Sequence, residues 1–182
     1  MSRAYKFRDP NQPYFVSFSI VRWMDIFTRR HYKDILVESL QYCIDHKGLV
    51  LHAWVIMTNH VHLAMASEKE PMHGILRDLK SFTSKQLYDA INQDPQESRK
   101  DWICYMIERE GAYNPQNVHI QVWQQGNRPI ELSSAYLMKQ KIDYIHQNPV
   151  EAGFVSQPEH YLYSSAFDYA GGKGMLPVVL AF

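Results

Sequence analysis

The chain has 182 residues, a hydrophobic content of 46% and 19 basic residues balanced by 19 acidic ones. These values are typical of one globular domain, and the zero formal net charge argues against binding to nucleic acid through bulk charge alone. Two cysteines are too few for a disulfide framework or a cysteine-based zinc site. We therefore expect one cytoplasmic domain over residues 1–182, with a core at about 13–155, an extension at 156–182, and no signal peptide or membrane span.

The first part of the chain alternates between strand-like and helix-like segments. Pro13–Trp23 alternates apolar and polar residues and is rich in β-forming types, which predicts a strand. Residues 29–48 place apolar side chains at helical spacing and predict a helix that ends at a glycine. Leu49–Met57 and His60–Ser67 predict two further strands, joined as a hairpin by the Thr58–Asn59 turn.

The second part of the chain continues this pattern. Pro71–Ile91 predicts a second helix, Trp102–Glu110 a local element, Val118–Gly126 a fourth strand and Ser133–Gln147 a third helix. The order is therefore βαββαβ, followed by one added helix near the C-terminus. This order predicts an α+β, ferredoxin-like (RRM-like) fold with an antiparallel sheet.

Two histidines lie one residue apart at the start of the third predicted strand. Because side chains along a strand alternate between faces, His60 and His62 project to the same face and Val61 to the other. Such a pair can bind one divalent metal ion, or it can form ordinary hydrogen bonds at the sheet surface. Further ligands would be oxygen or nitrogen donors. The sequence contains no zinc-protease or nucleotide-binding motif, so we expect no nucleotide cofactor.

The last predicted helix carries a tyrosine and an amide at helical spacing. Tyr144 and Asn148 lie four residues apart on a polar face, away from the apolar stripe that includes Ile142 and Ile145. Because Asn148 precedes Pro149, we expect the helix to end or kink there. A phenol beside an amide oxygen can attack a group bound to a metal that the amide ligates. The alternative is a surface tyrosine near a helix end.

Taken together, "NHVHL" and "YIHQNPVEAGFV" resemble the motifs of the IS200-like, single-tyrosine HUH transposases, most closely the branch that includes the REP-associated tyrosine transposases. A looser similarity covers "LKSFTSKQL" (Leu79–Leu87), "VWQQG" (Val122–Gly126) and "YSSAFDY" (Tyr163–Tyr169), so the resemblance spans most of the chain. It implies a ferredoxin-like fold in which the strand with the two histidines is central and the added helix carries the tyrosine.

The resemblance also implies a role for each residue of the site. His60 and His62 would bind Mg²⁺ or Mn²⁺, with Asn148 as the third protein ligand. Tyr144 would be the nucleophile of a transposase that cleaves and rejoins single-stranded, hairpin-containing DNA through a 5′-phosphotyrosine intermediate. Two positions depart from the commoner family pattern: Thr58 stands where a proline usually precedes the asparagine, and Asn148 stands where the best-known members use glutamine.

Four further residues are candidate DNA contacts: Lys80, Ser84 and Lys85 on the second predicted helix, and Lys141 beside Tyr144. The alternative for the first three is a solvated helix face, and for Lys141 an ordinary solvated lysine. Each chain carries one nucleophile, and joining two DNA ends needs two. We therefore expect a homodimer, although relatives that act as monomers leave the monomer open.

Two other functions are compatible with the sequence. One is a domesticated protein that binds DNA hairpins and no longer cleaves them. The other is a metal-dependent hydrolase that uses water as its nucleophile, which would leave Tyr144 without a role. Tyr136 is a rival nucleophile that lacks the motif match, and His146 is expected to be a structural residue.

Overall fold

The structure is a computed structural model that describes residues 7–114 and 119–182. It is an α+β fold built on one antiparallel sheet with the strand order β2-β3-β1-β4. The strands are β1 (Tyr14–Ser19), β2 (Leu49–Ile56), β3 (His60–Ser67) and β4 (Ile130–Glu131). The hairpin β2–β3 and the central position of β3 agree with the sequence prediction.

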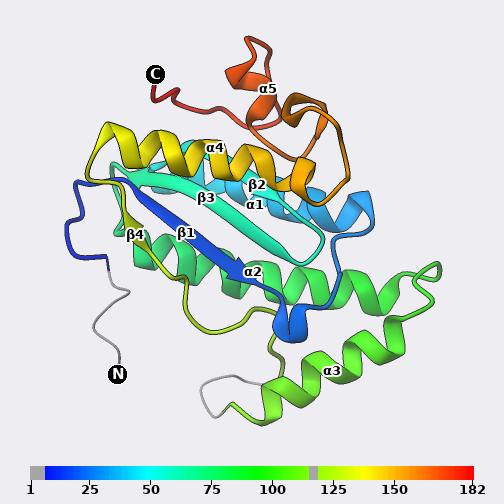
Figure 1. The fold of residues 1–182 in the computed structure, drawn as a ribbon. Helices are drawn as coiled ribbons and strands as arrows, with labels where there is room; N and C mark the ends of the chain where they lie inside the picture. Colours follow the sequence, from blue (N-terminus) through cyan, green and yellow to red (C-terminus); the bar gives the residue numbers. More distant parts are fainter. Residues whose placement is uncertain (1–6, 115–118) are drawn as a thin grey trace.

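Helices cover both faces of this sheet (Figure 1). On one face, α1 packs against α2 and β2, and α3 packs against α2. On the other face, α4 lies across β2 and β3, and the short segments near the C-terminus pack against α4. The helices are α1 (Arg30–Lys47), α2 (Met72–Gln93), α3 (Lys100–Ala112), α4 (Ala135–Glu151) and α5 (Ala166–Tyr169), with short 3-10 helices η1 (Val21–Trp23) and η2 (Pro158–His160).

The two faces of β1 and β3 carry different side chains. Phe18 faces α2, where its ring meets Trp123 and the Lys80 ammonium, and its cross-strand partner is Val61. Phe15 faces α4, where its ring stacks on that of His62. The strand alternation that the sequence predicted for the HVH segment is therefore confirmed.

The predicted first strand is longer than the strand in the structure. The first strand was expected to reach Trp23, but it ends at Ser19, because Arg22 and Trp23 adopt left-handed backbone angles that no strand accommodates. The local element expected at Trp102–Glu110 is present as the helix α3, which extends a few residues beyond the expected range.

The predicted fourth strand at Val118–Gly126 is wrong. Val118 lies outside the described residues, and the rest of the segment forms only an isolated bridge between Trp123 and Ile20. The segment still runs beside β1, because Gln124 N donates to Ser19 O at 2.8 Å. Positive φ angles at Gly126 and Arg128 interrupt a regular ladder there, and the paired strand β4 forms farther along the chain.

The prediction that the last helix ends or kinks at Asn148 is wrong about the end. α4 continues through Pro149 to Glu151, and its C-terminus is closed by Gly153 in the left-handed region, with Phe154 N donating to Pro149 O at 2.9 Å. Asn148 therefore stays on the helix, one turn beyond Tyr144. At the other end, the Ser134 side chain caps α4 by accepting from Leu137 N.

Among the described residues, none of the helices combines the length and apolarity that a membrane crossing requires.

Candidate active site

The four residues predicted for the active site converge on the face of the sheet that α4 covers. His60 and His62 come from β3, and Tyr144 and Asn148 come from α4. The rings of His60 and His62 are 4.8 Å apart between centroids, and the Tyr144 ring lies 5.2 Å from that of His62. Residues that are more than eighty positions apart in sequence thus form one cluster within a single chain.

The hydrogen bonds of His60 orient its ring. Asn59 donates through Nδ2 to the carboxylate of Asp25 at 2.9 Å and to Trp23 O at 3.2 Å, which turns its amide oxygen toward His60. His60 Nδ1 lies 2.7 Å from that oxygen, so Nδ1 carries the proton and donates. The Nε2 lone pair is then free to act as a metal ligand.

His60 Nε2 faces an oxygen that also has no proton to offer. The Asn148 amide nitrogen donates to Tyr144 O at 2.8 Å, so the Asn148 side-chain oxygen points away from the helix. That oxygen lies 3.4 Å from His60 Nε2. With Nδ1 protonated, two electron-pair donors face each other across this gap, and a cation that accepts from both removes the repulsion between them.

His62 is buried, and neither of its ring nitrogens has a hydrogen-bond partner in the described part of the chain. Burial, together with the nearby His60 and Lys141, lowers the pKa of His62 to about 3, and burial also lowers the pKa of His60. Both imidazoles are therefore neutral near pH 7, which is the form that binds metals. An orphaned buried imidazole costs free energy unless a ligand uses it.

The donor set fits a divalent metal ion. Two neutral imidazoles and one amide oxygen leave further coordination positions of such an ion for phosphate or water. In the described residues, no three His, Cys, Asp or Glu side chains cluster closely enough to hold a metal. A site here therefore depends on the amide of Asn148 as well as the two histidines.

Tyr144 combines contact with this cluster and access to solvent. Its side chain is 42% exposed, and its ring meets the Phe15 ring edge-on at 5.9 Å. The Lys141 ammonium lies over both rings, 4.9 Å from the Phe15 centroid and 5.4 Å from that of Tyr144. Lys141 thus places a positive charge beside the phenol.

Two serines of β1 lie opposite the histidines. Ser17 is the cross-strand partner of His62, and Ser19 is that of His60. The sequence pattern suggested a strand here without indicating why these positions are serine.

The candidate DNA contacts on α2 lie on the opposite face of the sheet. Lys80 is not a free cation: its ammonium donates to Gln124 O at 2.8 Å, Gly126 O at 3.2 Å and Asn127 Oδ1 at 3.1 Å. Burial lowers the pKa of Lys80 to about 8. This geometry differs from the expected phosphate contact, because all three ammonium hydrogens attach α2 to the segment beside β1.

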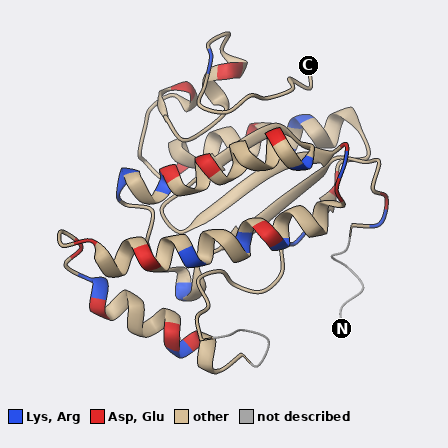
Figure 2. Cartoon of the chain, turned by 180° about the vertical axis from the view of Figure 1, so that it is seen from behind, with Lys and Arg blue, Asp and Glu red and all other residues tan. Residues whose placement is uncertain are grey.

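Ser84 and Lys85 line a groove between α2 and residues 119–127, with a volume of about 930 Å³. Arg77 and His73 line the same groove. Viewed from the α1 and α2 side, both helices carry basic as well as acidic residues (Figure 2). The basic side chains at this groove therefore form a small local group and are not part of a positive charge spread over the whole chain.

The two rival residues lie apart from the cluster. Tyr136 is 78% exposed near the start of α4, two turns before Tyr144. His146 is buried with Nε2 2.9 Å from the Ser165 hydroxyl oxygen, and burial lowers its pKa to about 4. The structural interpretation of His146 agrees with this contact.

Sequence reasoning missed Asp25, Phe15 and the orienting role of Asn59. The only signal for Asn59 was its position directly before His60. Nothing near Asp25 in the sequence points to a contact with His60. The contacts of Asp25 and Asn59 arise only when the turn after β1 meets the β2–β3 turn, and those of Phe15 arise when β1 pairs with β3 beneath α4.

Comparison with known proteins adds a fold relationship. No family model and no curated protein matches the sequence. A solved structure of a REP-associated tyrosine transposase bound to a REP hairpin matches with a TM-score of 0.64 and 18% identity, covering 100% of this chain and 94% of that chain. A crystal structure from Deinococcus radiodurans R1, assigned as a transposase, matches with a TM-score of 0.45 and 17% identity over 80% of this chain and 94% of that one. The chain therefore shares the fold of a REP-associated tyrosine transposase.

Proposed function

We propose that the chain is a single-tyrosine HUH transposase that cleaves and rejoins single-stranded, hairpin-containing DNA. One observation carries the proposal: in one chain, Tyr144 lies against His62 while the Asn148 oxygen faces His60 Nε2 at 3.4 Å. The fold shared with a REP-associated tyrosine transposase supports it. The strand order β2-β3-β1-β4, with α4 added over β3, supports assignment to the ferredoxin-like type.

The chemistry is a phosphodiester exchange. The Tyr144 oxygen attacks the phosphorus, the bond from phosphorus to the 3′-oxygen breaks, and the phenol proton is replaced by phosphorus while the 3′-oxygen leaves as a hydroxyl. The product is a 5′-phosphotyrosine ester, and attack by a 3′-hydroxyl reverses the step and restores Tyr144. Since one phosphodiester bond replaces another, the free energy of the broken bond is retained and rejoining needs no nucleoside triphosphate.

Residues of this chain account for positioning and charge. His60, His62 and Asn148 would hold a divalent ion, which when bound supplies electrophilic activation of the phosphate. Lys141 stabilises negative charge on the phenol oxygen or on a phosphate oxygen, since its ammonium lies over the Tyr144 ring. Asn59 keeps His60 in the tautomer that presents Nε2.

The proposed DNA-binding surface includes residues on both faces of the sheet. Lys141 lies at the active site, and Ser84 and Lys85 contact the backbone farther away through the groove beside α2. Lys80 shapes this groove through its bonds to residues 124–127. The contact between Tyr144 and His62 within one chain supports cleavage by a single chain. The homodimer stays a prediction for joining two ends.

The test is covalent capture of DNA. Incubation with single-stranded hairpin DNA and Mg²⁺ or Mn²⁺ should give a protein–DNA adduct that survives denaturing electrophoresis, and chelation of the metal should abolish it. Tyr144→Phe should give no adduct, whereas Tyr136→Phe, a change on the same helix, should react normally. An adduct from Tyr144→Phe would refute the assignment. Hairpin binding without any adduct in the parent protein would favour the non-cleaving alternative, and cleavage without an adduct would favour the hydrolase.

A further inference from the structure

The turn after β1 holds two large residues in a costly backbone conformation. Arg22 has φ 56° and ψ 18°, and Trp23 has φ 54°. Left-handed angles at residues other than glycine are strained and persist only where surrounding contacts impose them. Such conformations occur preferentially at functional sites, so the turn calls for an explanation.

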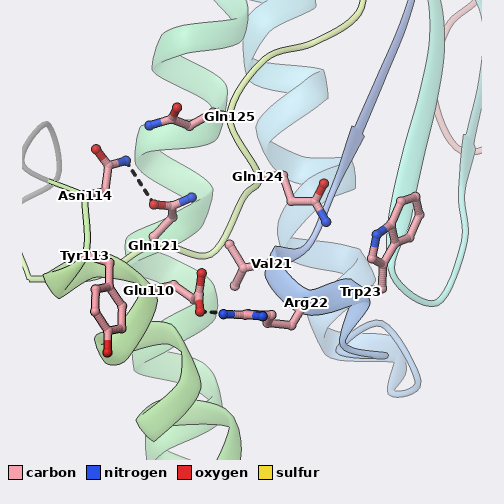
Figure 3. Close-up of a pocket in the computed structure, with 9 residues that line it drawn as sticks. All are labelled: Val21, Arg22, Trp23, Glu110, Tyr113, Asn114, Gln121, Gln124 and Gln125. Atoms are coloured by element: carbon pink, nitrogen blue, oxygen red, sulfur yellow. Dashed lines mark hydrogen bonds and ion pairs between the residues drawn. The ribbon is translucent and has the colours of Figure 1, made fainter.

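Three contacts impose this conformation. Trp23 N donates to Ile20 O at 3.0 Å, and Trp23 O accepts from the side chain of Asn59. Arg22 Nε donates to the Glu110 carboxylate on α3 at 2.8 Å (Figure 3). The turn is therefore attached both to the residue that orients His60 and to a separate helix.

The result of this conformation is an exposed indole rather than a buried one. Trp23 is 52% exposed, so the indole does not offset the strain by packing in the core. Its ring lies 6.2 Å from the His60 ring, at an interplanar angle of 67°. Trp23 thus presents an aromatic surface immediately beside the candidate active site.

A pocket of about 520 Å³ adjoins the same turn. Trp23 and Arg22 line it on one side, Gln124 and Gln125 above, and Glu110 and Tyr113 on the side of α3 (Figure 3). Gln124 Nε2 donates to Ile20 O at 3.1 Å, which fixes this amide beside the turn. Aromatic rings together with amide donors and acceptors are the groups that bind unpaired nucleobases, by stacking and by hydrogen bonds to the base edge.

We propose that Trp23 and this pocket bind one unpaired nucleobase of the DNA strand that crosses the active site. The base stacks on the indole, and its edge meets the amide of Gln124. The placement of this base next to the cleaved phosphate rests on the proposed function. Binding of the base itself does not, because the pocket contains neither Tyr144 nor a proposed metal ligand.

Equilibrium binding without cleavage tests this proposal. The protein carries Tyr144→Phe and is kept in chelator, so neither a metal nor covalent chemistry contributes to the signal. The probes are a fluorescent oligothymidylate of about twelve nucleotides and an abasic strand of equal length and charge. The unmodified pocket should bind oligothymidylate more tightly than the abasic strand. Trp23→Ala should weaken oligothymidylate binding by about fivefold to a hundredfold and leave the abasic strand unaffected.

The controls separate stacking from folding. Trp102→Ala removes a tryptophan that is also 52% exposed, on α3, and should leave both affinities unchanged. Trp23→Phe keeps an aromatic face and should restore much of the preference for bases, which a merely structural role would not predict. Equal binding of the two probes by the parent protein, or an equal loss for both probes in Trp23→Ala, would overturn the proposal. Either result leaves the covalent-capture test of Tyr144 untouched.

Discussion

The two faces of β3 differ in what they contribute to the protein. Toward α1 and α2, Val61, Leu63 and Met65 are fully buried in an apolar core. Toward α4, the same strand presents His60 and His62, and His62 is buried with both ring nitrogens unpartnered in the described residues. Burial of apolar groups stabilises the fold, whereas an unpartnered buried imidazole opposes it. One strand therefore contributes stability on one face and keeps a costly group on the other.

The largest expected effect is on stability, and it is tested by replacing one residue from each face of β3. Leu63→Ala should lower the free energy of unfolding by about 2–5 kcal/mol, because it opens a cavity in the apolar core. His62→Ala should cost clearly less, since it also removes two unpartnered polar atoms, yet it should abolish Mn²⁺ binding. Urea unfolding and titration calorimetry measure the two quantities. An equal or larger loss of stability in His62→Ala would show that this imidazole contributes to the fold, contrary to the comparison.

The next largest effect distinguishes the structural role of Lys80 from the DNA-binding role proposed for Lys85, both on α2. Lys80→Ala should lower the free energy of unfolding by about 1.5–3 kcal/mol, because it removes charge-assisted hydrogen bonds to residues 124–127. Lys85→Ala, on the exposed side of the same helix, should leave stability unchanged and weaken binding to single-stranded DNA. Denaturant unfolding and fluorescence anisotropy test the pair. Unchanged stability in Lys80→Ala would return Lys80 to the role of a phosphate contact.

A smaller effect concerns the orientation of His60. Asn59→Ala removes the acceptor that holds the proton on His60 Nδ1 and should weaken Mn²⁺ binding by about tenfold to a hundredfold. Asn92→Ala, an exposed asparagine at the end of α2, is the matched control. Calorimetric titration with Mn²⁺ measures the change. If both variants bind Mn²⁺ as the parent protein does, the Asp25–Asn59–His60 chain of contacts has no part in metal affinity.

The smallest effect is a pH dependence on the α4 face. His146 has a pKa of about 4 in the fold because it is buried, against an ordinary value of 6.5. Between these values the unfolded chain binds more protons, so the free energy of unfolding should fall as the pH falls through this window. His146→Gln should make this fall shallower by at most about 1.4 kcal/mol per pH unit, while exposed His73→Gln should not. Parallel slopes for the parent protein and His146→Gln would contradict the assignment.

Local patterns predicted much of the secondary structure and part of the site. The hairpin β2–β3, the helices α1 and α2 and the added helix α4 follow from periodicity, because each is a property of neighbouring residues. The errors lie where long-range contacts decide the backbone. Residues 119–127 have strand-like composition yet form no ladder, and α4 runs through Pro149 because packing against β2 and β3 outweighs one lost helical hydrogen bond.

The sequence by itself determined that His60 and His62 share one face of a strand and that Tyr144 and Asn148 share one face of a helix. Both follow from the fixed periods of strand and helix. Only the tertiary structure decided that these two faces meet, that Asn59 and Asp25 set the tautomer of His60, and that Trp23 stands exposed beside it. These are contacts between distant segments, and they depend on how α4 and the turn after β1 pack on the sheet. No local period encodes that packing.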